Sequence, residues 1–191
     1  MVAGNGRHDS MGNDSISKAL ITAEDIQVKV RQIGDQISRD YAGMHPVLVG
    51  VLNGALIFMA DLMREIDLPL EAYMMAASSY DGYESTGTVE IIKPLEASIT
   101  GRHVILVEDI VDTGITLDSL LESLQSEGPA SLEICALLDK KSRRQVEVPI
   151  KYVGFEIPDE FVVGYGLDYN QQYRNLPYVA SMNAAVVNAA G

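Results

Sequence analysis

Three apolar runs of strand length constrain the fold of this chain more than any other feature. They lie at residues 46–52, 103–107 and 132–138, and amphipathic helix patterns separate them. A strand that is apolar along its whole length has both faces buried, which is typical of a parallel sheet with helices on both sides. We therefore predict an α/β fold with a mainly parallel, twisted sheet that is flanked by helices.

The predicted helices have clear starts and apolar faces. Thr22 and Asp25 form a capping pair for the first helix, whose apolar face repeats at Ile26, Val30, Ile33 and Ile37. The second helix is predicted at 55–66, with Leu56, Met59, Leu62, Met63 and Ile66 facing inward, and the third at 117–126. Further strands are predicted at 72–79, at 89–92, near Tyr152 and at 161–163.

The chain length of 191 residues fits a single domain with a sizeable core. Residues 1–17 are rich in Gly, Asn, Asp and Ser and lack an apolar centre, so we interpret them as a disordered leader and not as a signal peptide. We predict one domain over residues 18–181 and a flexible tail over 182–191. No apolar stretch approaches the ~20 residues that a membrane span needs.

Charge and cysteine content restrict the partners and the compartment. The net charge of −13 argues against nucleic acid or an anionic membrane as the main partner, because both require a basic surface. Cys135 is the single cysteine, so no intrachain disulfide can form, and a reducing, cytoplasmic location fits. Its apolar neighbours favour a buried packing residue over a nucleophile.

The segment 104–117 carries the strongest chemical signal. An apolar run ends in two adjacent carboxylates, Glu108 and Asp109, and Asp112 opens a short glycine-containing loop before a helix. Carboxylates accept hydrogen bonds from sugar hydroxyls, and loop amides at a helix N-terminus hold anions. The pattern therefore predicts a sugar phosphate site. Because ligands of parallel sheets collect at the carboxyl ends of strands, residues 53–54 and 139–140 are expected beside it.

Plainer interpretations of the same segment remain open at this point. Asp112 could cap the helix, and Glu108 and Asp109 could be solvated residues at the end of a strand. Other phosphate-binding loops are excluded, because the chain has neither a Gly-x-x-x-x-Gly-Lys sequence nor a Gly-x-Gly-x-x-Gly sequence after a strand. A phosphoacceptor receiver domain also has acids at strand ends, but it does not require this loop.

The segment closely resembles the phosphoribosyl pyrophosphate motif of the type I phosphoribosyltransferases, in the form typical of the hypoxanthine-guanine branch. Three further segments match in order: 51–54 resembles the pyrophosphate loop, 78–80 the start of the mobile loop, and 154–170 the purine-binding and metal-binding segment. The resemblance covers about residues 20 to 180. It implies the type I phosphoribosyltransferase fold, with a small hood subdomain from the N-terminal segment and residues near 150–180.

The reaction that the resemblance implies is displacement of pyrophosphate from C1 of the ribose by a nitrogen of hypoxanthine or guanine, which yields IMP or GMP. The 5′-phosphate and ribose would be bound by Glu108, Asp109, Asp112, Thr113, Gly114, Ile115 and Thr116. Ile115 stands where relatives often carry a polar or basic residue, so it would contribute its amide alone. Asp112 would accept a proton from the purine, or orient the base by a hydrogen bond.

Pyrophosphate and its metal ion are assigned by the same resemblance. Leu52, Asn53, Gly54 and Arg174 would bind pyrophosphate, with Ser79 and Tyr80 in the mobile loop, and Mg²⁺ would be held by Asp168 with Glu108 and Asp109. Asn53 stands where some relatives carry a basic residue, so this loop would bind mainly through its backbone. A guanidinium such as that of Arg174 suits a phosphate, because it can donate two parallel hydrogen bonds.

Purine selection would fall to Lys140, Phe161, Val162 and Asp168. By the resemblance, Lys140 donates to O6 of the purine, Phe161 stacks on the ring and Val162 reads the opposite edge through its backbone. A lysine that donates to O6 would reject adenine, which has an amino group there. Without the resemblance, Lys140, Asp168 and Arg174 would be interpreted as surface charges.

A second hypothesis is a non-catalytic regulator that senses phosphoribosyl pyrophosphate through the same loop. Such regulators usually bind nucleic acid and need a basic surface, which the net charge of −13 disfavours. The hypoxanthine-to-guanine preference and the use of xanthine stay open. By resemblance we expect phosphoribosyl pyrophosphate and 6-oxopurine bases as ligands, and a homodimer or homotetramer.

Overall fold

The computed structural model describes residues 15–79 and 89–188. Along the chain it contains β1 (Ile16–Ile21), α1 (Ala23–Asp40), β2 (Val47–Leu52), α2 (Leu56–Glu65), β3 (Glu71–Ser79), β4 (Val89–Lys93), β5 (His103–Val111), α3 (Ile115–Ser126), β6 (Ser131–Asp139), the 3-10 turn η1 (Lys141–Arg143), β7 (Ile150–Glu156), β8 (Val162–Val163), β9 (Val179–Met182) and α4 (Ala184–Asn188). Strands and helices alternate through most of the chain, as the apolar runs predicted.

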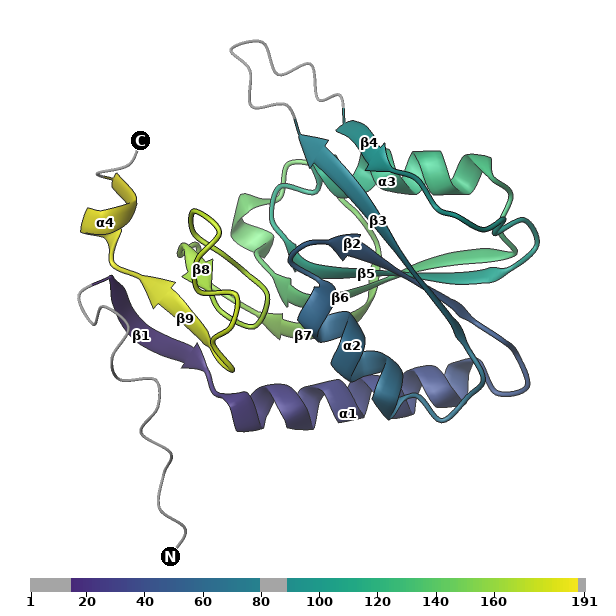
Figure 1. The fold of residues 1–191 in the computed structure, drawn as a ribbon, viewed down its shortest axis with the longest axis horizontal. Helices are drawn as coiled ribbons and strands as arrows, with labels where there is room; N and C mark the ends of the chain where they lie inside the picture. Colours follow the sequence, from purple (N-terminus) through teal and green to yellow (C-terminus); the bar gives the residue numbers. More distant parts are fainter. Residues whose placement is uncertain (1–14, 80–88, 189–191) are drawn as a thin grey trace, which may run out of the picture.

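The larger of two sheets has the strand order β4-β3-β2-β5-β6-β7 (Figure 1). Its neighbours from β3 to β7 pair in parallel, and β4 is the antiparallel edge strand. The predicted α/β fold with a mainly parallel sheet is therefore confirmed. The parallel arrangement brings the carboxyl ends of β2, β5 and β6 to one edge of the sheet, which is where ligands bind in such folds.

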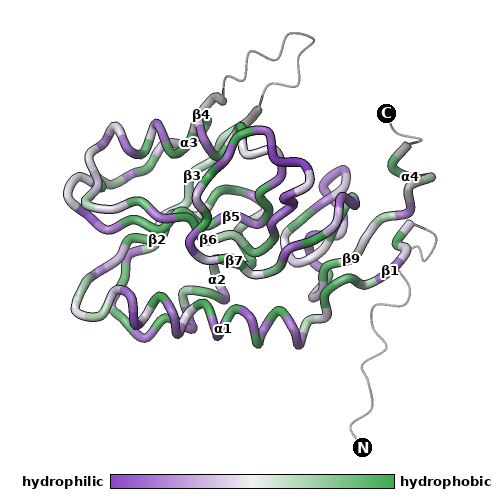
Figure 2. The backbone as a smooth tube through the Cα atoms, turned by 180° about the vertical axis from the view of Figure 1, so that it is seen from behind, coloured by the Kyte–Doolittle hydropathy of each residue, from purple (hydrophilic) through white to green (hydrophobic). Residues whose placement is uncertain are grey.

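Helices cover both faces of this sheet, and two apolar clusters fill the space between. One cluster joins α1 and α2 to one face through Ile26, Ile37, Phe58, Leu62 and Ile105, and the other joins α3 to the opposite face through Leu106, Leu120 and Leu124. Figure 2 shows apolar colour concentrated along β2, β5 and β6. No helix in the described part of the chain is long and apolar enough to cross a membrane.

The helix predictions hold for α1 and need one correction for α2. Thr22 caps α1 and its hydroxyl accepts from the Asp25 amide at 3.1 Å, as the sequence predicted. In α2, Leu56 and Met63 were expected inward but are 51% and 38% exposed, whereas Phe58 is fully buried. The buried face follows Phe58, Met59 and Leu62, with the spacing of one helical stripe, so Leu56 and Met63 fall on its flank.

A small antiparallel sheet with the order β1-β9-β8 joins the two ends of the described chain. It lies beside the main sheet in Figure 1, next to the start of α1. The sequence patterns predicted β8, as the strand at 161–163, but missed β1 and β9. Ile16 and Ser17 were expected in a disordered leader but belong to β1, and the tail expected at 182–191 begins with the last residue of β9 and includes α4. Short strands pair across long sequence distances, which local periodicity does not reveal.

Candidate active site

A cavity of about 700 Å³ lies between the carboxyl ends of β5 and β6 and the segments on either side of β8. Its walls are formed by Asp109, Ile110, Asp112, Lys140, Arg143, Asp159, Glu160, Phe161, Val162, Leu167, Asp168, Met182 and Val187. Six of these residues were predicted to bind ligand: Asp109, Asp112, Lys140, Phe161, Val162 and Asp168. The fold therefore gathers residues that are up to 59 positions apart in the sequence around one volume.

The two adjacent carboxylates do not follow β5 but lie within it. The sequence predicted a strand that ends at Val107, whereas β5 continues to Val111 and Glu108 pairs with Ala136 of β6. Because neighbouring residues of a strand point to opposite faces, the two side chains separate. Asp109 lines the cavity, and Glu108 is buried and does not.

Burial makes both carboxylates hard to ionise. It raises the pKa of Glu108 well above its usual range, and the charge of Asp109 adds to the shift. Burial also raises the pKa of Asp109 to about 6, although its Oδ1 accepts a hydrogen bond from the Ile110 amide at 2.8 Å. Asp168 raises the Asp109 pKa further, and Arg174 lowers it. A cation beside Asp109 would relieve this cost.

Asp112 stands directly after β5 with two cations facing it. Lys140 Nζ lies 3.9 Å from Oδ2, and Arg143 Nε lies 3.3 Å from Oδ1. Among the described residues no group makes a well-formed hydrogen bond to Oδ1, which is itself buried. Arg143 also reaches Asp159 across the cavity at 3.6 Å. Asp112 therefore lines the cavity with its carboxylate between two positive charges.

The loop from Asp112 to Thr116 is built to expose backbone amides. Gly114 adopts φ 86° and is the N-cap of α3, so Asp112 does not cap the helix. A Cβ atom at Gly114 would lie 2.3 Å from the Val146 carbonyl oxygen, and the Gln145 and Val146 amides donate to the Thr113 carbonyl at 2.9 and 3.0 Å. The first-turn amides of α3 have no partners within the helix and can bind an anion.

The residues that were predicted to bind the purine line one side of the cavity. Lys140 is 7% exposed, so it is not the surface lysine that its neighbours suggest, and its amide donates to the Val111 carbonyl at 2.9 Å. Phe161 is 42% exposed and packs edge-to-face on Tyr169, with the ring centroids 5.6 Å apart. Val162 is buried in β8. An open aromatic face beside a buried ammonium suits a flat, polar ring.

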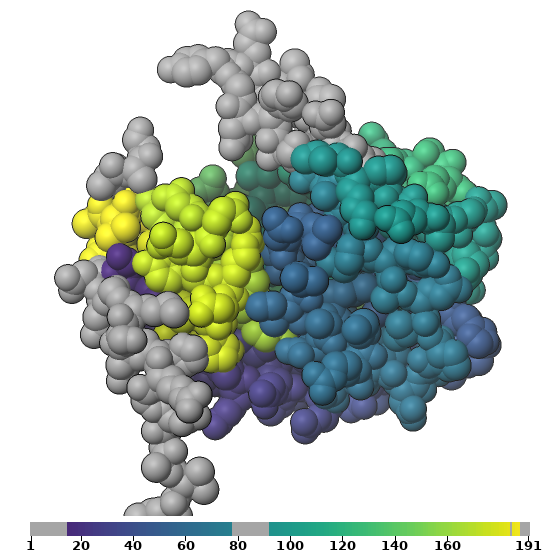
Figure 3. Space-filling model, viewed as in Figure 1, coloured from purple at the N-terminus to yellow at the C-terminus, as the bar shows by residue number. Residues whose placement is uncertain are grey.

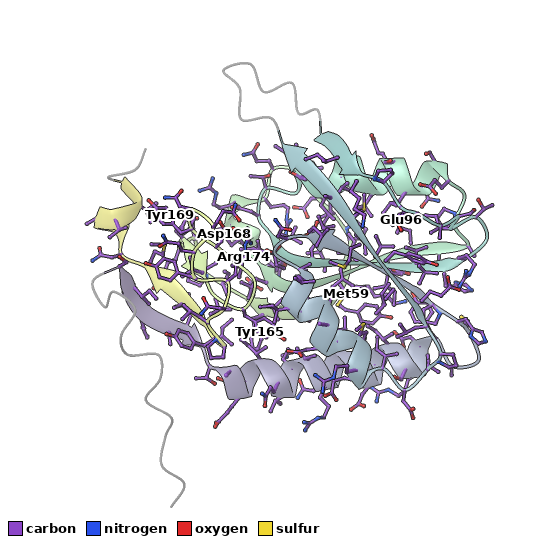
Figure 4. The ribbon with its side chains drawn as sticks, viewed as in Figure 1. Met59, Glu96, Tyr165, Asp168, Tyr169 and Arg174 are labelled. Atoms are coloured by element: carbon purple, nitrogen blue, oxygen red, sulfur yellow. The ribbon has the colours of Figure 1, made fainter. Side chains whose placement is uncertain are left out.

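Asp168 and Arg174 form an ion pair on the opposite side (Figure 4). The Arg174 Nη2 lies 2.7 Å from the Asp168 Oδ1, and its Nη1 donates to the Gly166 carbonyl at 2.7 Å. The Asp168 Oδ2 accepts from the Gln171 amide at 2.8 Å. The described residues contain no group of three or more His, Cys, Asp or Glu side chains placed to hold a metal ion, and the set of Asp168, Glu108 and Asp109 stays a prediction. Of these three residues, Glu108 is buried in β5 and does not line the cavity.

The turn from Leu52 to Gly54 contacts both Asp109 of β5 and Gly166 in the segment before Asp168. The Leu52–Asn53 peptide bond is cis. A Cβ atom on Gly54 would lie 1.6 Å from the Asp109 carboxylate, and one on Gly166 would lie 2.1 Å from the Gly54 carbonyl. The turn therefore packs against backbone at Gly166 and against the Asp109 side chain at Gly54, and both contacts depend on the absence of a Cβ atom.

Some site features lie outside the prediction or outside the described chain. Ser79 ends β3, and Tyr80 falls beyond the described residues, so its predicted contact with pyrophosphate is not tested. Arg143 and Asp159 line the cavity and were not predicted. The adjacent basic residues 140–144 were the available signal for Arg143, but such runs are usually solvated.

Comparisons with known proteins agree with this geometry. A phosphoribosyl transferase domain model matches residues 18–170. A hypoxanthine-guanine phosphoribosyltransferase of Staphylococcus aureus is 50% identical over 177 residues, which cover 92% of this chain and 98% of the relative.

Solved structures give the same result. A crystal structure of a hypoxanthine phosphoribosyltransferase from Staphylococcus aureus has a TM-score of 0.90 at 49% identity, with 94% of this chain and 98% of that chain covered. The hypoxanthine phosphoribosyltransferase of Trypanosoma cruzi has a TM-score of 0.88 at 36% identity, with 94% and 97% covered. The chain belongs to the phosphoribosyltransferase family, in the branch of the hypoxanthine-guanine enzymes.

Proposed function

We propose that this protein is a purine-salvage enzyme that transfers the phosphoribosyl group of phosphoribosyl pyrophosphate to hypoxanthine and guanine, which forms IMP or GMP and pyrophosphate. The observation that carries this proposal is the arrangement of one cavity in which Asp112, the buried Lys140 and the half-exposed Phe161 face the same volume. Family membership supports phosphoribosyl transfer as the reaction class, and the residues of this cavity support a 6-oxopurine base as the acceptor.

The phosphoribosyl group would lie on the main-sheet side of the cavity. The amides of residues 113–116 at the start of α3 would bind the 5′-phosphate, because the local field and the free amides favour an anion. Thr113 and Thr116 can add hydroxyl donors. Asp109 would accept hydrogen bonds from the ribose hydroxyls, since it lines the cavity beside this loop. Glu108 is buried, and we assign it to the support of β5.

Pyrophosphate would leave toward Arg174 and the backbone of Leu52 to Gly54. Arg174 is held by Asp168 and the Gly166 carbonyl, so its guanidinium is pre-oriented before the substrate binds. Negative charge builds on the leaving group as the bond to C1 breaks, and a fixed guanidinium stabilises this charge.

Mg²⁺ fits the oxygen-rich side chains at this end of the cavity. A Mg²⁺ ion usually takes one or two carboxylates together with substrate phosphates and water, so three clustered carboxylates are not needed. Asp168 would hold the ion, with Asp109 as its neighbour, whose raised pKa fits a group that gains from a nearby cation. When bound, the ion neutralises charge on the pyrophosphate oxygens.

The base would be held by Phe161, Val162 and Lys140, with N7 toward Asp112. Lys140 donates to O6, and Asp112 accepts the proton that the purine loses as its ring nitrogen attacks C1. A buried ammonium would face another donor if adenine were bound, which explains the expected selection.

We further propose a cytoplasmic homo-oligomer. The relative from Trypanosoma cruzi has been studied for the effect of its C-terminal region on oligomeric state, and in the present chain Met182 of β9 and Val187 of α4 line the cavity. Light scattering of the purified protein tests the oligomeric state directly.

Steady-state kinetics with hypoxanthine, guanine, xanthine and adenine at fixed phosphoribosyl pyrophosphate and Mg²⁺ test the enzyme proposal. We expect pyrophosphate release with hypoxanthine and guanine and none above background with adenine. A protein that binds phosphoribosyl pyrophosphate but releases pyrophosphate with none of the four bases would instead be the regulator.

A further inference from the structure

Tyr165 occupies an unusual backbone conformation beside the proposed pyrophosphate site. Its φ is 50°, and its neighbours Gly164 and Gly166 have φ values of 99° and 105°. A side-chain-bearing residue in this region is strained and persists where surrounding contacts hold it in place. The side chain of Tyr165 is 6% exposed, and its amide donates to the Leu176 carbonyl at 2.8 Å. The turn therefore depends on what Tyr165 contacts.

The strongest polar contact of Tyr165 reaches a different part of the fold. Its hydroxyl donates to Asp61 Oδ2 at 2.7 Å, and Asp61 lies on α2. The buried residues Phe58 and Leu62 fix α2 to the main sheet, so the backbone that carries Asp61 is held in place. Arg64 lies 3.8 Å from the other oxygen of Asp61, near the surface. In Figure 3 the yellow-green segment around β8 lies against the blue region that contains α2.

The residue after Tyr165 connects this anchor to the pyrophosphate groups. Gly166 accepts from Arg174 Nη1 at 2.7 Å through its carbonyl and donates to the Arg174 carbonyl at 3.0 Å. It also packs so closely on the Gly54 carbonyl that a Cβ atom would lie 2.1 Å away. Figure 4 shows Tyr165 on the α2 side of the segment that carries Asp168 and Arg174. A shift at Tyr165 would therefore move Arg174 relative to Gly54.

We infer that the hydrogen bond from Tyr165 to Asp61 positions Arg174 and the loop of Leu52 to Gly54 for a pyrophosphate-bearing ligand. Tyr165 does not line the cavity, so we assign it a positioning role that acts through Gly166. This inference rests on the proposed function. It differs from a role in general stability because it predicts an effect on one substrate and not on the other.

The chain contains a matched control for this contact. Tyr152 of β7 is 1% exposed and donates to Asp40 Oδ2 of α1 at 2.8 Å. It is a second buried tyrosine that bonds to a helix carboxylate, but it does not line the cavity. Tyr152→Phe therefore removes the same chemical group from a similar environment without a connection to Arg174.

The experiment compares Tyr165→Phe with Tyr152→Phe by kinetics, thermal unfolding, and calorimetric binding of pyrophosphate with Mg²⁺. We expect Tyr165→Phe to raise KM for phosphoribosyl pyrophosphate and Kd for pyrophosphate about 10-fold, as loss of an outer supporting contact commonly does. KM for hypoxanthine should stay at the wild-type value. Tyr152→Phe should lower the melting temperature and leave all three constants unchanged.

Two variants of Asp61 separate positioning from loss of structure. Asp61→Ala removes the acceptor and should reproduce the effect of Tyr165→Phe, with no further increase in the double variant. Asp61→Asn keeps an acceptor oxygen and should restore the wild-type KM for phosphoribosyl pyrophosphate.

Two results with an active wild type would overturn the positioning role alone. In the first, Tyr165→Phe keeps the wild-type KM for phosphoribosyl pyrophosphate. In the second, it raises the KM values for phosphoribosyl pyrophosphate and for hypoxanthine equally. A wild type that releases no pyrophosphate with any base would overturn the proposed function, and the inference with it.

Discussion

The two walls of the cavity are built in different ways. The wall that carries Asp112 and Lys140 stands at the ends of β5 and β6, where parallel backbone pairing fixes each residue. The wall that carries Asp168, the ion-pair partner of Arg174, is made of turns, and four side-chain-bearing residues in this segment have positive φ: Tyr165, Asn170, Gln171 and Tyr173. The first wall is rigid because of the sheet, whereas the second is held by a few side-chain contacts. Chemistry should therefore depend on the first wall and leaving-group affinity on the second.

The largest effect should follow from a change in the first wall at Asp112. We expect Asp112→Asn to lower kcat about 10²- to 10⁴-fold, the usual contribution of a general base. The affinity for phosphoribosyl pyrophosphate should stay close to that of the wild type, since the amides of the loop remain. Asp118→Asn, the same substitution within α3, is the control in kinetics and calorimetry. Unchanged turnover in Asp112→Asn would remove Asp112 as the base.

A change at Lys140 tests the same wall at the base. Lys140→Met should lower kcat/KM for hypoxanthine and guanine about 10- to 100-fold, because O6 loses a charged donor. Lys141→Met is the neighbouring control, since Lys141 is exposed and pairs with Glu156. Equal losses in both variants, measured with both bases, would contradict the assignment.

The second wall is tested by a methyl group placed where the turns meet. Gly166→Ala should raise KM for phosphoribosyl pyrophosphate about 10-fold or more, because the contact with the Gly54 carbonyl must open and the supports around the site shift. Gly101→Ala is the control for a methyl group at a positive φ: Gly101 has φ 69°, and a Cβ atom there meets nothing within 4 Å. If both variants lose stability and neither loses substrate affinity, the close contact is not part of the site.

The smallest effect concerns the carboxylate where the walls touch. The pKa of Asp109 is raised to about 6 in the folded protein, so the folded state binds a proton more tightly than the unfolded chain. This group therefore favours the folded state most below about pH 4, and that advantage is lost as the pH rises through 6. Asp109→Asn should stabilise the ligand-free protein by about 1 kcal/mol at pH 7.5 and have little effect near pH 4.

Thermal or urea unfolding of both proteins at the two pH values measures this difference. A stabilisation that is the same at both values would show that it arises from packing and not from ionisation. With substrate and Mg²⁺ bound, the wild type should be more stable than Asp109→Asn, since the ribose hydroxyls and a nearby cation interact with the ionised Asp109.

The difference between the walls also explains what could be predicted from the sequence. The apolar runs predicted β2, β5 and β6, and residues at their ends were correctly expected near one another. The full length of β5 was not predicted. Glu108 and Asp109 resemble the polar end of a strand, but β5 continues through them to Val111. The pairing of β1 with β9 joins distant segments, and no local pattern reports it.

For the second wall, motif resemblance identified Asp168 and Arg174 but not the contacts that hold them. The bond from Tyr165 to Asp61 connects residues 104 positions apart and depends on a left-handed turn. The burial of Lys140 likewise follows from tertiary packing, since the basic residues that follow it, Lys141 and Arg143, are exposed.

A crystal structure of the protein with IMP, Mg²⁺ and pyrophosphate tests the arrangement of both walls at once. We predict the purine against Phe161, with O6 within hydrogen-bond distance of Lys140 Nζ and N7 facing Asp112, the 5′-phosphate on the amides of residues 113–116, and pyrophosphate between Arg174 and Gly54. A purine bound outside this cavity, or a Lys140 ammonium that does not contact O6, would contradict the proposed site.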